Sequence, residues 1–192
     1  WRMAVNLCRL PLSLALIFSG FVKAIDPLGT QYKIGDYLEA LHLEQYAPSW
    51  ATLTTSVLLS AVEFCLGVFL LFAIRRRKVS RVIVAFMAIM TAITVWLWGW
   101  EPIKDCGCFG DAIHLTNGET LLKNLLLLAM AAVVAWKPFC MVRFISKTNQ
   151  WIVINYTLLF ILVSSTLSLW YLPPFDFRPY HIGADIRKGM EI

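Results

Sequence analysis

Charged residues are scarce in this sequence. Asp, Glu, Lys and Arg make up 15% of its 192 residues, whereas 59% are hydrophobic and the mean hydropathy is +0.68. A soluble domain of this size needs far more polar surface, so the composition excludes a soluble globular protein and predicts an integral membrane protein. The net charge of +5 does not indicate nucleic-acid binding, because the basic residues cluster at the ends of apolar segments, as membrane-topology signals do.

Internal repeats and low-complexity tracts are also absent, and the sequence is dominated instead by long apolar runs. A helix needs about 20 apolar residues to cross a bilayer. We expect five such helices, near residues 5–25, 51–74, 79–100, 119–136 and 150–171. The predicted fold class is therefore an all-α integral membrane bundle of about five helices, in which residues 1–172 form the membrane region.

Acidic residues are missing from one side of this predicted bundle. The basic run at residues 75–81 joins the second span to the third, and other basic residues flank the first span and join the fourth to the fifth. By the positive-inside rule this side is cytoplasmic. We expect the N-terminus there, and loops 26–50 and 101–118 and the tail from residue 172 on the opposite side.

A segment between Thr30 and Tyr46 has the pattern of an amphipathic helix. Apolar side chains fall on one helical face, and charged ones lie elsewhere: Ile34, Tyr37, Leu38 and Leu41 against Lys33, Asp36, Glu39 and Glu44. This pattern is typical of an interfacial helix on the outer leaflet. We expect it to act either as a plain connector on the membrane surface or as a lid over the following outer loop.

Cysteine is uncommon and its positions are informative. Cys8 and Cys140 fall at the inner face and Cys65 within a span, so only Cys106 and Cys108 face an oxidising compartment. A disulfide across one intervening residue closes a small, strained ring, and such bonds are the labile ones. We therefore predict that Cys106 and Cys108 cycle between dithiol and disulfide.

Two inert alternatives remain for this cysteine pair. One is a static disulfide that staples the turn, and the other is a partial metal site with Asp111 and His114. A closed zinc site needs four ligands and the loop offers only two good ones, so no metal is expected.

Aromatic and polar residues next to the cysteine pair suggest a quinone site. Flat apolar surfaces at the same depth come from Trp96, Trp98, Trp100 and Phe109. Lys123 and Asn124 lie one to two turns below the start of the fourth span, and Lys23 lies at the outer end of the first. Either lysine can hydrogen-bond a quinone carbonyl. The plainer alternatives are interfacial anchoring for each Trp and snorkelling for Lys123.

Glu63 is the one acidic residue within a predicted span, roughly 18 Å below the outer surface at 1.5 Å per residue. A charge at the bilayer centre costs about 2.5–3.5 kcal/mol on insertion scales, so we expect this carboxyl to be protonated or paired. Ser13, Thr91 and Thr94 are the partners expected at comparable depth. The role left for Glu63 is a proton relay or packing.

Two motifs carry a resemblance to a known family. The run from Ile17 to Gly29, followed by Asp105-Cys106-Gly107-Cys108-Phe109-Gly110-Asp111, resembles the DoxX-like membrane proteins of the MauE branch, in the form found in Bacteroidota. The tail motif at residues 176–180 is also similar. The resemblance implies a bacterial inner-membrane bundle with a four-helix redox core, whose relatives exchange electrons between periplasmic protein thiols and membrane quinone.

The resemblance also implies that the chain is a fragment. Relatives of this form continue after the last span into a thioredoxin-like periplasmic domain, so residues 173–192 are expected to lead into a C-terminal domain beyond Ile192. The start at Trp1 agrees with this expectation. The first span is too long for a removable signal peptide and lacks its cleavage pattern.

The predicted function is thus thiol–disulfide exchange through Cys106 and Cys108. One thiolate attacks a disulfide of a thioredoxin-like domain or periplasmic thiol protein, the other resolves the mixed disulfide, and electrons pass to or from menaquinone or ubiquinone. A non-catalytic scaffold of a larger membrane complex, with a structural disulfide, is the first alternative. The second is a small-solute transporter with Glu63 as relay, which the absence of visibly broken spans disfavours.

Overall fold

The computed structural model describes residues 1–43, 48–100 and 115–171, and these are helical without a strand. Five helices are long and apolar enough to cross a membrane, which confirms the predicted fold class: α1 Arg2–Ile25, α3 Ser49–Leu71, α4 Arg76–Trp100, α5 Asn117–Trp136 and α6 Gln150–Trp170. Each begins and ends within three residues of the expected position. Two shorter elements are α2, Pro27–Ala40, and a 3₁₀ turn η2, Pro138–Cys140.

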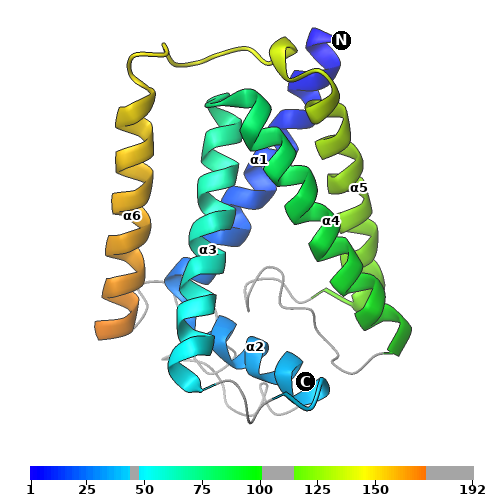
Figure 1. Cartoon of the computed structure of the whole chain (residues 1–192), viewed down its shortest axis with the longest axis vertical. Coiled ribbons are helices and arrows are strands. Elements are labelled where there is room, and N and C mark those ends of the chain that lie inside the picture. Colours follow the sequence, from blue (N-terminus) through cyan, green and yellow to red (C-terminus); the bar gives the residue numbers. More distant parts are fainter. Residues whose placement is uncertain (44–47, 101–114, 172–192) are drawn as a thin grey trace, which may run out of the picture.

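The helices form a four-helix core with one helix at its side. In Figure 1, α1 crosses behind α3, α4 packs along α5, and α6 stands apart beside α3. Helices α3 and α4 meet at the end of the bundle where α1 begins and diverge toward the opposite end, where α2 lies (Figure 1). The core of buried apolar side chains, which includes Leu12, Leu70 and Ile83, occupies the half of the bundle where α3 and α4 meet.

The crossing of α1 and α3 depends on two glycines. A Cβ atom on Gly20 would lie 2.4 Å from the backbone nitrogen of Phe64, and one on Gly67 would lie 2.7 Å from that of Ile17. Small residues at such a crossing let two membrane helices approach closely, and dispersion contacts between their backbones then hold them together. The close approach fixes which residues of α1 and α3 face each other on either side of the crossing.

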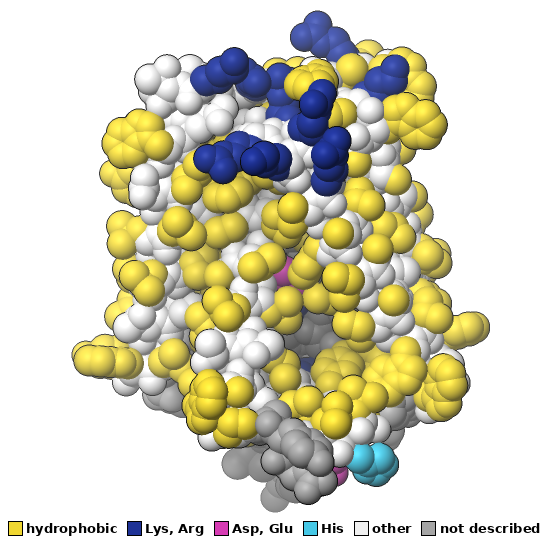
Figure 2. All heavy atoms as spheres, in the orientation of Figure 1, with side chains coloured by type: hydrophobic (Ala, Val, Ile, Leu, Met, Phe, Trp, Pro, Cys, Tyr) yellow, Lys and Arg dark blue, Asp and Glu magenta, His cyan; other side chains and the backbone are white. Residues whose placement is uncertain are grey.

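Lys and Arg side chains gather at the end where α1 begins, which we call the basic end (Figure 2). Some of these side chains also form hydrogen bonds that hold the helices and their connections together. Arg9 is 1% exposed, and its Nη1 donates to the carbonyl oxygen of Val142 at 2.7 Å. The Nη1 of Arg76 donates to the carbonyl oxygens of Phe139 and Met141. These bonds attach the connection between α5 and α6 to α1 and α4.

Candidate cofactor cavity

A cavity of about 560 Å³ occupies the half of the bundle away from the basic end. Its walls come from four helices: Lys23 of α1, a face of α2 that includes Ile34, Thr55 and Leu59 of α3, and Ile93 and Trp96 of α4. The wall is largely apolar, with a few hydrogen-bonding groups. Figure 2 shows the surface hollowed on this face. The divergence of α3 and α4 creates the space, and α2 bounds it at the far end (Figure 1).

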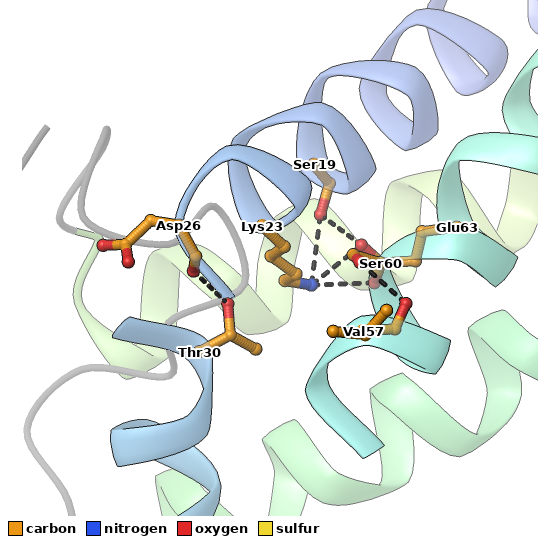
Figure 3. Close-up of polar contacts among 7 residues, drawn as sticks. All are labelled: Ser19, Lys23, Asp26, Thr30, Val57, Ser60 and Glu63. Carbon is orange, nitrogen blue, oxygen red and sulfur yellow. Dashed lines mark hydrogen bonds and ion pairs between the residues drawn. The ribbon is translucent and has the colours of Figure 1, made fainter. Parts of the chain in front are cut away.

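Lys23 of the cavity wall belongs to a buried ion pair (Figure 3). Nζ of Lys23 lies 2.8 Å from both carboxylate oxygens of Glu63, and the two residues are 4% and 3% exposed. Ser19 lies one turn before Lys23, and its hydroxyl donates to Oε2 of Glu63 at 2.8 Å. Nζ of Lys23 also donates to Oγ of Ser19 at 3.3 Å. Charge-assisted hydrogen bonds of this kind offset the large cost of burying two charges.

The partners expected for Glu63 were wrong, although a paired state was one of the two expected. Ser13, Thr91 and Thr94 each donate instead to a backbone carbonyl of their own helix, at Leu10, Met87 and Met90 respectively. Hydroxyl groups within a helix satisfy themselves in this way, so they are not held ready for a distant carboxylate. The lysine, which can neutralise the charge, takes that place.

A second, much smaller space lies on the other side of Glu63. This chamber holds about 30 Å³ and is bounded by Ser19, Glu63, Lys123 and Asn124 together with apolar side chains of α1, α4 and α5. Asn124 is 3% exposed, and its Nδ2 donates to Oγ1 of Thr94 at 2.7 Å. Met90 borders both the chamber and the cavity. The ion pair therefore stands between the two spaces.

Comparison with protein-family models gives a match to the family described as methylamine utilisation protein MauE, over residues 1–137. The chain belongs to the MauE family. The resemblance seen in the sequence is thereby confirmed, and membership is consistent with a membrane protein of a redox or maturation system. Searches of curated proteins and of solved structures found no match.

The region that matches the MauE family runs from α1 through α5, and it therefore contains every residue of the cavity wall and the chamber. Helix α6 lies outside the matched region. Within the described ranges, no group of three or more His, Cys, Asp or Glu side chains is placed to hold a metal ion.

Among the residues predicted to bind a quinone, Lys23 lines the cavity of this MauE family member and Trp96 does so as well. Trp98 and Trp100 do not line it; they are 56% and 76% exposed. The reason is helical geometry, because Trp98 lies two residues beyond Trp96 and so points to the opposite side of α4. Trp100 is the last residue of α4, a full turn beyond Trp96.

Lys123 and Asn124 border the chamber and not the cavity, and their predicted role in binding a quinone stays a prediction. Helix α5 packs against α4 and α1. Its polar residues Lys123 and Asn124 therefore share the chamber with Glu63. The positions of Cys106, Cys108 and Phe109 lie outside the described residues, and their predicted roles stay predictions.

Helix α2 supplies the part of the site that the sequence analysis missed. Lys33 and Tyr37 line the cavity together with Ile34 and Leu41 of the face predicted to lie on the membrane. An apolar face toward lipid and one toward an apolar cavity give the same pattern, so periodicity did not separate them. A further signal was available in Asp26-Pro27, because an N-cap residue followed by Pro marks a helix start.

Proposed function

We propose that this MauE family protein is a membrane thiol–disulfide oxidoreductase that transfers electrons between a thioredoxin-like periplasmic partner and a membrane quinone. Cys106 and Cys108 would exchange disulfides with the partner, and the cavity among α1 to α4 would hold the quinone. The observation that carries the proposal is the cavity itself: a large, mostly apolar space with a buried ammonium group on its wall.

The cavity has the properties that a quinone requires. Ligand sites of about 300–1,000 Å³ are typically lined by apolar and aromatic side chains with a few fixed polar groups. Here Leu59, Ile93 and Trp96 supply the apolar surface, and Lys23 and Tyr37 supply groups of the kind that donate to carbonyl oxygens. To bond a ligand, the Lys23 ammonium would exchange one of its bonds to Ser19 and Glu63 for a bond to that ligand. The hollow on this face of the molecule (Figure 2) would give a lipid-soluble ligand a route in from the bilayer.

The position of the cysteine loop in the chain supports the same proposal. Helix α4 ends at Trp100 and α5 begins at Asn117, so residues 101–116 connect the helix ends that lie away from the basic end. The positive-inside rule assigns the basic end to the cytoplasm and these helix ends to the periplasm. In the reaction a dithiol and a quinone become a disulfide and a quinol: two electrons and two protons leave the thiols, and the quinone gains two of each.

The test is quinone reduction by a reduced thioredoxin-like protein, followed by quinone absorbance with the full chain in lipid nanodiscs. Cys106→Ser and Cys108→Ser should each abolish turnover. Leu59→Trp fills the cavity and should lower the rate at least tenfold, whereas Leu58→Trp, on a neighbouring side chain that is 59% exposed, should leave it unchanged. Full turnover by the double serine variant would overturn the proposal and favour the scaffold alternative.

A further inference from the structure

The chamber behind Glu63 has the size and polarity of a water site. A buried water needs a space of roughly 10–15 Å³ and two to four hydrogen-bonding partners. The chamber offers about 30 Å³, and four residues with hydrogen-bonding side chains line it: Ser19, Glu63, Lys123 and Asn124. Both Ser19 and Asn124 are buried, while Lys123 is partly exposed.

The ion pair connects this chamber to the cavity. Glu63 borders the chamber and Lys23 borders the cavity. The 2.8 Å contacts between Nζ of Lys23 and the Glu63 carboxylate therefore link the two spaces. Ser19 holds the carboxylate from the side of α1 (Figure 3). A proton on a chamber water is thus three transfers away from a cavity ligand: water to the Glu63 carboxylate, Glu63 to Lys23, and Lys23 to the ligand.

We propose that Ser19, Lys23, Glu63 and the chamber form a proton-delivery path to the ligand in the cavity. The inference rests on the proposed function, because it takes the ligand to be a quinone. Reduction of a quinone to a quinol consumes two electrons and two protons. Lys23 gives its proton to a quinone oxygen as electrons arrive. A proton carried by chamber water as hydronium then passes to the Glu63 carboxylate, and Glu63 passes it on to the Lys23 amine, which restores the ion pair. Two such cycles supply both protons, and the thiols that provide the electrons release two protons outside.

An ion pair with only a structural role would not require the two spaces that adjoin this one. It would need neither a hydrated chamber behind the carboxylate nor a ligand cavity beside the lysine, and replacing the pair by apolar residues is often neutral for stability. The occurrence of both spaces, one at each end of a single ion pair, is what favours transfer of a proton over packing.

Two variants test the path without altering the wall of the cavity. Glu63→Gln keeps the shape and the hydrogen bond from Ser19 but cannot carry a proton. Ala15→Val adds apolar bulk at the chamber wall and leaves the ion pair intact, and Ala132→Val makes the same change at an exposed position of α5 as a control. The assay is quinone reduction in nanodiscs, in H₂O and in D₂O.

Both Glu63→Gln and Ala15→Val should lower kcat at least tenfold, raise the solvent isotope effect and leave KM for quinone unchanged, while Ala132→Val behaves as wild type. In wild type, infrared difference spectra on quinone reduction should show a carboxylate band that Glu63→Gln lacks. If wild type turns over and both variants match it in kcat, the path is refuted and the proposed function stands. No turnover in wild type would refute both.

Discussion

Gly20→Ala tests the helix crossing that brings the ion pair together. The added Cβ would lie 2.4 Å from the nitrogen and 2.8 Å from the Cα of Phe64, both backbone atoms, so no side chain can move aside. Because ordinary contacts between such atoms are about 3.5 Å or longer, α1 and α3 must separate by about 1 Å at this point. Lys23 is one turn from Gly20, and Glu63 adjoins Phe64. Contacts of 2.8 Å between them would lengthen to about 3.8 Å, beyond hydrogen-bonding distance.

The expected change in the free energy of unfolding is the sum of two opposing contributions. Overpacking a well-packed contact costs about 1–3 kcal/mol, whereas replacing Gly by Ala within a helix gains roughly 0.5–1 kcal/mol. A net loss of about 1–2 kcal/mol lowers Tm by about 2–8 °C for a chain of this size. The assay is thermal unfolding in detergent, followed by helical circular dichroism.

Gly35→Ala in α2 is the matched control, because a Cβ there would meet nothing within 4 Å. This variant should keep or slightly raise Tm, since it gains helix propensity without a clash. A Gly20→Ala protein as stable as the Gly35→Ala protein would refute the inference that a tight backbone crossing positions Lys23 and Glu63.

Three further experiments have defined outcomes. Thr116→Ala removes the capping box at the start of α5 and should cost about 1 kcal/mol, measured as a lower Tm. A double-mutant cycle of Asn124→Leu and Thr94→Val should give a coupling of about 0.6–1.7 kcal/mol in unfolding free energy, because their 2.7 Å bond joins α4 to α5. Lys23→Met alone should destabilise by about 3–5 kcal/mol, whereas Lys23→Met with Glu63→Leu should restore most of that stability; equal Tm values for the two would contradict the buried pair.

The membrane helices were predictable because each is an apolar run of the length that a bilayer demands. The contact between Lys23 and Glu63 could not be predicted, because the depth of each residue in the membrane was counted along its own helix from the outer surface. That count placed Lys23 at the surface and Glu63 far below it. In the structure α1 is tilted across α3, and its last turn lies beside the middle of α3 (Figure 1). Counting residues gives distance along a helix, and only packing gives its tilt.

The cavity was beyond prediction for a related reason. Its apolar wall is drawn from helices that are far apart in sequence, and a side chain that faces an apolar cavity looks like one that faces lipid. Trp96 and Trp98 illustrate the limit: both are aromatic and at similar depth, yet one lines the cavity and the other does not. Helix rotation decides between them, and it depends on contacts of α4 with α5 that the sequence pattern does not specify.

The placement of the ion pair bears on why the bundle carries it at all. Burying two charges is expensive, and the hydrogen bonds from Ser19 and between Lys23 and Glu63 offset that expense without making the pair a clear gain in stability. Intramembrane ionisable residues mark functional sites for this reason. The lysine lines the large cavity and the glutamate lines the small chamber, so the two partners of the pair face different spaces. If the restored double variant Lys23→Met with Glu63→Leu is stable yet unable to reduce quinone, stability and function separate at this pair.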